Sequence, residues 1–163
     1  GERKIKESIK EPNPPFYLLL INSNKSKNTI ESLKDVLEKV TNESMAMKSI
    51  EDISDITTEI FSCMSQGNLK TRFHKLLKKN HSHLKELSVS CESIDDIVDY
   101  FDNKEFGCKL TGGGRGGFAI TIFSKEEHSR ISEIVSNLNQ KGYKCTEILL
   151  DSFPQILYTL EYP

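Results

Sequence analysis

The fold is decided by residues 109–123, which read KLTGGGRGGFAITIF. Five of the nine glycines of the chain fall within the six positions 112–117, directly before an apolar run. Glycine tolerates positive φ and carries no Cβ, so such a loop can turn its backbone N–H groups toward one point and let a phosphate or another backbone come close. The run 118–123 is largely apolar on both alternating faces, which predicts a buried strand that anchors the loop in the core.

The two fingerprints that usually mark a phosphate loop are absent from this chain. It contains no G-x-x-x-x-G-K-[ST], and no G-x-G-x-x-G opens a helix, because this glycine loop opens a strand. From composition alone, a plain connection between two strands is therefore as good an interpretation as a phosphate-facing loop.

Length, charge and cysteine usage limit the class of protein. With 163 residues the chain is long enough for one domain with its own hydrophobic core. The formal charge of −2 lacks the basic surplus of a nucleic-acid binder. The four cysteines form no C-x-x-C pair, and no apolar run approaches the ~20 residues that span a bilayer. We therefore expect a cytoplasmic protein with a small, soluble partner, bound to neither nucleic acid nor membrane.

Apolar periodicity divides the chain into strands and helices. Short apolar runs predict strands at 16–21, 108–110, 118–123, 143–150 and 156–160. Spacings of three and four predict five helices, each with one apolar face. We expect the core faces, in chain order, to be Ile30, Leu33, Val36, Leu37 and Val40; Ile50, Ile53, Ile56, Ile60 and Met64; Leu69, Phe73, Leu76, Leu77, Leu84 and Leu87; Ile94, Ile97, Val98 and Phe101; and Ile131, Ile134, Val135 and Leu138.

Capping residues predict where the helices begin and end. A serine followed three positions later by an acidic residue predicts capping boxes at Ser49, Ser93 and Ser124. Gly67 is expected to end the second helix and Gly142 the fifth.

These elements predict a two-layer α+β domain, in which a few strands are backed by about five helices. The domain occupies residues 16–163. Residues 1–15 are charged and then proline-containing, which indicates an extended lead-in or a tag remnant.

No group of side chains in the sequence declares a catalytic or metal site. His81 and His83 are two residues apart on a predicted helix and point to roughly opposite sides, so both cannot face one ion. We expect capping or solvent-facing roles for Asp95, Asp96 and Asp99 at the start of the fourth helix. We therefore predict no catalytic residue and no metal ligand in this chain.

Residues 25–29, KSKNT, join the first predicted strand to the first predicted helix. Backbone N–H groups and the helix dipole favour an anion at such a junction, and the two lysines add positive charge. A solvated turn capped by Ser26 or Asn28 is the competing interpretation.

The string KLTGGGRGG at 109–117 resembles the C-terminal glycine motif of the GHMP small-molecule kinases, in the version K-L-T-G-A-G-G-G-G that mevalonate kinases carry. Residues 20–29, LINSNKSKNT, resemble the segment L-T-N-T-K-V-P-R-N-T of mevalonate kinases, whose basic residue and final threonine lie beside the mevalonate pocket. The resemblance therefore implies that Lys27 and Thr29 bind substrate. Lys27 stands where the family has arginine, which keeps the charge and loses the bidentate fork.

Two further segments carry the same resemblance. Residues 80–90, NHSHLKELSVS, are similar to N-Q-H-H-L-N-A-L-G-V-G, and residues 142–147, GYKCTE, are similar to the G-F-x-C-x-E of eukaryotic mevalonate kinases. Within the glycine motif, Gly113 replaces an alanine and Arg115 replaces a glycine. We expect the change at Gly113 to be mild and the side chain of Arg115 to point to solvent.

The resemblance covers only the C-terminal half of such a kinase. It implies a ferredoxin-like domain with a mainly antiparallel sheet of about four strands, which lacks the N-terminal ATP-binding half with its phosphate loop, catalytic aspartate and lysine. The whole enzyme would transfer the γ-phosphoryl group of ATP to mevalonate with Mg²⁺. The part that lines the cleft toward the phosphates would be Thr111, Gly112, Gly113, Gly114, Arg115, Gly116 and Gly117.

The resemblance also implies partners and alternatives. The N-terminal domain of the same kinase would be one partner, and an apolar face exposed without it would favour self-association, such as a homodimer. Another GHMP kinase, acting on phosphomevalonate or a sugar, is one alternative. A ligand-binding module that keeps the fold without catalysis is the other.

Overall fold

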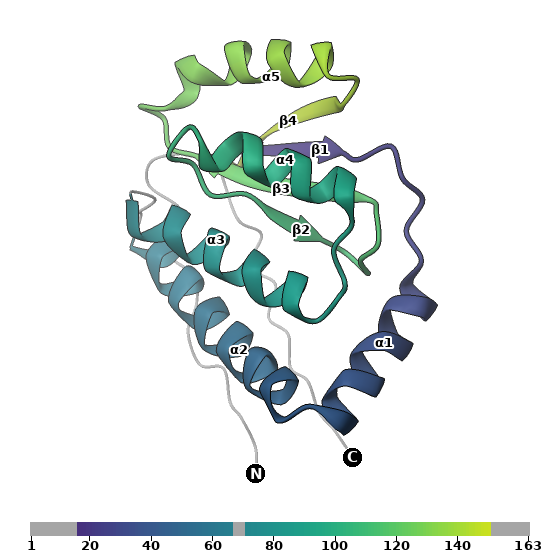
Figure 1. Ribbon diagram of the computed structural model, residues 1–163. Coiled ribbons are helices and arrows are strands. Elements are labelled where there is room, and N and C mark those ends of the chain that lie inside the picture. The colour runs from purple at the N-terminus through teal and green to yellow at the C-terminus, as the bar shows by residue number, and fades with distance from the viewer. Residues whose placement is uncertain (1–15, 67–70, 151–163) are drawn as a thin grey trace, which may run out of the picture.

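The computed structural model describes residues 16–66 and 71–150 and shows one sheet backed by helices (Figure 1). The sheet has four antiparallel strands in the order β2-β3-β1-β4. Its strands are β1 (Phe16–Asn22), β2 (Lys109–Thr111), β3 (Phe118–Phe123) and β4 (Lys144–Leu150). These four elements confirm the predicted strands, and β1 lies in the interior of the sheet. The strand expected at 156–160 and the lead-in 1–15 lie outside the described residues.

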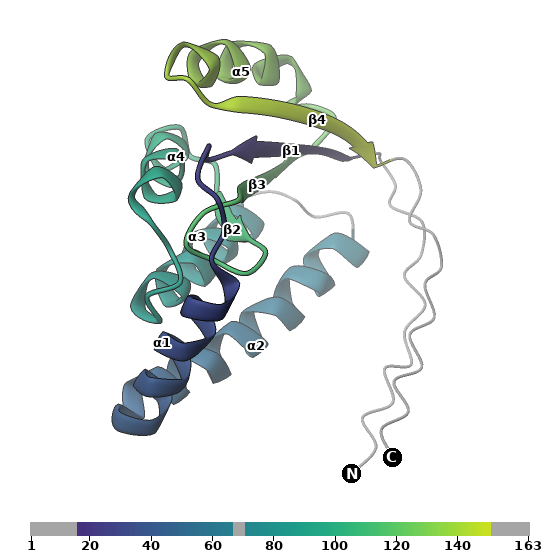
Figure 2. The ribbon, with the colours of Figure 1, turned by 90° about the vertical axis from the view of Figure 1, so that its right-hand side faces the viewer.

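Five α-helices occur in the described part of the chain, which confirms the α+β class. They are α1 (Thr29–Asn42), α2 (Ser44–Ser65), α3 (Thr71–Glu86), α4 (Glu92–Asp102) and α5 (Ile131–Gln140), the last preceded by a 3₁₀ turn at His128–Arg130. Helices α2 and α3 pack side by side, α5 covers β4, and α1 stands apart from the sheet (Figures 1 and 2). No helix in the described residues is long and apolar enough to cross a membrane.

Alternate residues of the strands supply two hydrophobic clusters, because successive side chains of a strand point to opposite faces. Leu19 and Ile21 of β1 pack with residues of α4 and α5 in the larger cluster. Phe16 of β1 and Ile122 of β3 pack with residues of α2 and α3 in the smaller one. The expected core faces of α4 and α5 are confirmed, since Ile94, Ile97, Val98, Phe101, Ile131, Ile134 and Leu138 are all buried.

The predicted core face of α1 is wrong for three of its five residues. Ile30, Leu33 and Leu37 are 72%, 64% and 68% exposed. Val36 and Val40 do pack against the core. The apolar pattern of α1 is wide enough for two faces, and among the described residues only one of them is covered by another element. We call Ile30, Leu33 and Leu37 the α1 stripe.

The α1 stripe leads us to expect that the 163-residue chain self-associates at high concentration, because contiguous exposed apolar side chains favour contacts between molecules. Replacing Leu33 and Leu37 together with serine should shift the chain toward monomer. It should change the free energy of unfolding by less than about 1 kcal/mol, since surface substitutions have small effects. Analytical ultracentrifugation of both forms over a concentration series tests this. A wild-type chain that sediments as a monomer throughout would contradict it.

Two of the three predicted capping boxes are wrong because the serines have other places. Helix α2 begins at Ser44, so Ser49 lies inside it, and its hydroxyl donates to Glu86 Oε2 at 2.8 Å. Helix α4 follows an N-cap at Cys91, which places Ser93 within its first turn. Local sequence spacing could not reveal the hydrogen-bond partner of Ser49, because Glu86 lies 37 residues away.

The predicted start of α5 is wrong, whereas its predicted end agrees with the structure. The N–H of Ser124 does donate to Glu127 Oε2 at 2.8 Å, one half of a capping box, but α5 begins only at Ile131, after Arg130 at its N-cap. At the other end Gly142 has φ +89, its N–H donates to the carbonyl of Asn139, and the next N–H donates to the carbonyl of Leu138. This pair of hydrogen bonds is a Schellman motif, so Gly142 ends α5 as expected.

Candidate functional site

The glycine loop, residues 112–117, joins β2 to β3 and keeps a left-handed backbone over most of its length. Positive φ occurs at four of its glycines, with +136° at Gly116 the most extreme, and also at Arg115, with +56°. Side chains other than glycine rarely adopt such angles, so the glycine content follows from the shape of the loop.

A second segment lies along the glycine loop. We call residues 23–28, between β1 and α1, the connector. The N–H and the hydroxyl of Ser23 both donate to the carbonyl of Gly117 at 2.9 Å, and the N–H of Gly117 donates to the carbonyl of Lys25 at 2.9 Å. Because β1 and β3 are antiparallel, with Asn22 opposite Phe118, the end of one strand meets the start of the other. Figure 1 shows the two segments side by side, where β1 ends and β3 begins.

The structure brings both predicted substrate residues to the glycine loop. A Cβ placed on Gly113 would lie 2.1 Å from Thr29 Oγ1, so the threonine side chain fills the space beside that glycine. Lys27 is exposed, and its Cβ is 3.9 Å from the position that a Cβ on Gly117 would take. Between them Asn28 caps α1, accepting a hydrogen bond from the N–H of Glu31 at 3.2 Å. Thr29 therefore sits at the first turn of α1, where the helix dipole favours negative charge.

Part of the hydrogen-bonding capacity of the loop is unused. The N–H groups of Arg115 and Gly117 donate to the carbonyls of Val89 and Lys25, at 2.7 and 2.9 Å. Within residues 16–66 and 71–150, the N–H groups of Gly113, Gly114 and Gly116 donate no hydrogen bond. Backbone N–H groups in a turn of this shape can bind an anion such as a phosphate.

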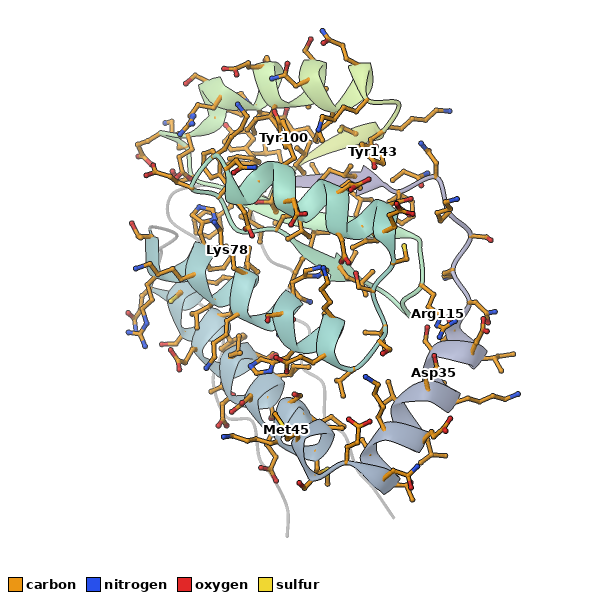
Figure 3. The ribbon with its side chains drawn as sticks, in the orientation of Figure 1. Asp35, Met45, Lys78, Tyr100, Arg115 and Tyr143 are labelled. Carbon is orange, nitrogen blue, oxygen red and sulfur yellow. The ribbon has the colours of Figure 1, made fainter. Side chains whose placement is uncertain are left out.

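Arg115 does not point to solvent as expected. Its guanidinium pairs with the carboxylate of Asp35 and, at 3.3 Å, with that of Glu31 (Figure 3). Both carboxylates belong to α1, four residues apart and thus on one face. The sequence contains that spacing, but nothing local links it to an arginine 80 residues away.

Strand β2, which leads into the loop, is held by a buried histidine. His81 Nδ1 accepts a hydrogen bond from the N–H of Leu110 at 3.3 Å, so Nε2 carries the proton and donates to Asp95 Oδ1 at 3.2 Å. Asp95 also accepts from Ser90 at 2.6 Å and pairs with Lys85 at 2.8 Å. The expected capping or solvent-facing role of Asp95 is therefore wrong.

Burial and hydrogen bonding shift the pKa of both groups downward. Burial lowers the pKa of His81 by disfavouring its charged form, against the opposing effect of Asp95. Burial alone would raise the pKa of Asp95, but hydrogen bonds from Lys85, Ser90 and His81 together lower it. At neutral pH His81 is a neutral donor beside a carboxylate.

We predict that acid destabilises the protein through these two groups. Below about pH 6.5 the histidine of the unfolded chain takes up a proton that folded His81 does not take up. Near pH 4 the same holds for Asp95. The free energy of unfolding therefore decreases as the pH is lowered. His81→Asn should lower the free energy of unfolding at pH 7 and should weaken its dependence on pH between pH 7 and 5. Urea denaturation at several pH values measures this, and one proton is worth up to about 1.4 kcal/mol per pH unit. An unchanged slope in the variant would contradict the assignment.

A metal site does not form in the described part of the chain, since no group of three or more His, Cys, Asp or Glu side chains there could hold an ion. His81 and His83 lie in α3 with different partners, Asp95 for the first and Glu86 with Asp52 for the second. The functional groups near the loop are therefore backbone N–H groups, a lysine and a threonine.

An antiparallel sheet with a glycine loop before β3, backed by these helices, is the arrangement that the resemblance to small-molecule kinases implies. The family described as "GHMP kinases C terminal" matches residues 58–144, more than half of the chain. The chain belongs to this family.

Individual relatives agree with that assignment. The chain is 32% identical to a mevalonate kinase of Methanocaldococcus jannaschii over 87% of its own length and 42% of the relative's. It is 30% identical to a galactokinase of Thermotoga neapolitana over 73% of its own length and 33% of the relative's. The fold matches the crystal structure of L. major mevalonate kinase in complex with R-mevalonate with a TM-score of 0.73, at 20% identity, over 85% of this chain and 43% of that one. The chain thus spans less than half the length of these relatives.

Proposed function

We propose that this chain is the C-terminal domain of a mevalonate kinase. The whole enzyme would transfer the γ-phosphoryl group of ATP to the 5-hydroxyl of mevalonate, a step toward isoprenoids and sterols, in the cytoplasm. The observation that carries the proposal is that the connector, with Lys27 and Thr29, lies directly against the glycine loop. The two segments that resemble mevalonate kinases thereby form one surface.

Each part of that surface has a role in the proposed reaction. The free N–H groups of Gly113, Gly114 and Gly116 would face the phosphates, where developing charge must be stabilised. The exposed ammonium of Lys27 would attract the carboxylate of mevalonate, and the hydroxyl of Thr29 would hydrogen-bond the substrate. Phosphoryl transfer depends mainly on positioning and charge, so these groups suit the reaction without being catalytic themselves.

The remaining parts of the machinery would come from a preceding half of the kinase. We expect that half to supply the catalytic aspartate and lysine, most of the ATP site and the Mg²⁺ ligands, and this chain alone to be inactive. It would also be the partner of this domain. ATP with Mg²⁺ would supply the phosphoryl group when bound.

A kinase assay on the full-length gene product, beside the 163-residue chain, tests the proposal. The assay couples ADP release to NADH oxidation, with mevalonate, galactose, homoserine and phosphomevalonate as competing acceptors. We expect turnover with mevalonate, and only in the long form. Turnover of another acceptor with mevalonate untouched would replace the proposal, and no turnover of any acceptor would favour a ligand-binding module.

Galactokinase is the second candidate function, because one relative of that activity is nearly as similar to this chain as the mevalonate kinase. The galactose arm of the same assay decides between them. Lys27 favours mevalonate, since galactose carries no charge for an ammonium to pair with.

A further inference from the structure

We propose that Gly113 and Arg115 act together as a latch that fixes Thr29 within the glycine loop. Gly113 admits the threonine side chain, and Arg115 ties α1, which begins at Thr29, to the loop. The two are positioning residues, and the inference rests on the proposed function of Thr29.

The first half of the latch is the space at Gly113. A Cβ there would lie 2.1 Å from Oγ1, 2.8 Å from Cγ2 and 2.9 Å from Cβ of Thr29. Rotating the threonine side chain cannot relieve a contact with its Cβ, so an alanine at this position requires α1 to retreat. Ser32, three residues further along α1, is also near the loop, since a Cβ on Gly114 would lie 3.1 Å from Ser32 Oγ. The first turn of α1 therefore packs against two glycines of the loop.

The second half of the latch is the arginine beside it. The N–H of Arg115 donates to the carbonyl of Val89 at 2.7 Å, which ties its backbone to the segment after α3. Its guanidinium pairs with Asp35 and Glu31 of α1. The side chain of Arg115 is 33% exposed and that of Asp35 29%, so water screens this pair less than a fully exposed one. Charge-assisted pairs of arginine with carboxylates are among the stronger hydrogen bonds of proteins.

The two halves act on the same element in the same direction. With Arg115 paired to α1, the helix cannot retreat, and Thr29 remains pressed into the space at Gly113. The guanidinium charge is already balanced by two carboxylates, so Arg115 influences the site through the position of α1.

The latch predicts a specific pattern of kinetic coupling in the full-length gene product. Arg115→Gly should free α1 and raise the KM for mevalonate roughly tenfold, with kcat changed less, because misplacement of a binding group weakens substrate positioning. Gly113→Ala should have a similar effect, because the added methyl group displaces α1. The double variant should raise the KM no further than either single change, roughly tenfold, since both changes act by displacing the same helix. Arg115→Lys, which keeps the charge, should lie between wild type and Arg115→Gly.

A matched control separates positioning from stability. Arg72 pairs with Glu59 at 2.7 Å on the far helices α3 and α2. Arg72→Gly removes an arginine–carboxylate pair in the same way and should leave the KM unchanged. Hydrogen exchange of residues 25–35 gives a readout that needs no turnover, and it should speed up in Arg115→Gly and not in Arg72→Gly.

Each outcome decides the inference. Two results would overturn the latch. One is a KM in the double variant that equals the product of the effects of Gly113→Ala and Arg115→Gly. The other is a hydrogen-exchange rate of residues 25–35 that is the same in Arg115→Gly as in wild type. Absence of turnover in the wild-type long form, with faster exchange at 25–35 in Arg115→Gly, would refute the proposed function and leave the physical latch standing.

Discussion

In the full-length kinase that we propose, Gly116→Val should abolish turnover while leaving most of the domain folded. Gly116 has φ +136, and a Cβ there would lie 2.8 Å from the carbonyl oxygens of both Lys25 and Ser26. Valine can neither adopt that angle without strain nor fit against two backbone oxygens. The connector and the loop must then separate, and with them Lys27 and Thr29. We expect kcat/KM for mevalonate to fall at least about 100-fold.

The matched control for this substitution is Gly142→Val. Gly142 also has positive φ, +89, but nothing lies within 4 Å of the position of its Cβ. The control therefore carries the conformational strain without the crowding. It lies at the end of α5, and its carbonyl, which accepts a hydrogen bond from Asn24 Nδ2 of the connector at 2.7 Å, is a backbone group that the substitution keeps. We expect it to lower the melting temperature and to retain kcat/KM within a few-fold at a temperature where both variants are folded. Wild-type kinetics in Gly116→Val would show that the loop does not shape the substrate site.

Local patterns in the sequence predicted the elements that depend on local physics. The run 118–123, the apolar faces of α4 and α5 and the end of α5 at Gly142 all follow from periodicity and capping within one segment. These predictions did not require knowing which elements pack against each apolar face, because an apolar face is buried in a similar way against many surfaces. The same reasoning placed the glycine loop directly before a core strand.

The failures share a different cause, which is that the deciding partner lies far away in the chain. Leu33 and Leu37 continue the apolar spacing of α1, yet spacing cannot tell a covered face from an uncovered one. Ser49, Asp95 and Arg115 have partners 37, 14 and 80 residues away. In each case the polar side chain pairs with a residue that is distant in sequence and does not have the role that its local position suggested.

The candidate site could be predicted only in part from the sequence. The resemblance to a kinase motif singled out Lys27 and Thr29, and residues 111–117, as separate segments. Their meeting follows from the antiparallel register of β1 and β3, which no pattern within either strand specifies. The close contact of Thr29 with Gly113 depends further on the tilt of α1, and only the structure supplies it.

Gly107→Ala should cause the largest loss of stability of any single methyl group added to this chain at a described glycine. A Cβ at Gly107 would lie 2.1 Å from the carbonyl oxygen of His74 and 2.8 Å from its Cα and carbonyl carbon, all backbone atoms of α3. Backbone cannot rotate away as a side chain can, so the segment before β2 must move off the helix. That movement also breaks the hydrogen bond from the N–H of Gly107 to His74 Nδ1, at 3.1 Å, and leaves a buried donor unpaired.

Overpacking and an unsatisfied donor together should lower the free energy of unfolding by about 3 kcal/mol or more. Urea denaturation of wild type, Gly107→Ala and Gly142→Ala measures it, and the last of these should lose only the ~1 to 2 kcal/mol of a left-handed backbone with open space around it. Phe106 and Cys108, on either side of Gly107, are both buried in the larger cluster, so the displacement should reach β2 and the loop that follows it. A loss at Gly107 no greater than that at Gly142 would mean that α3 and the segment before β2 are not in backbone contact.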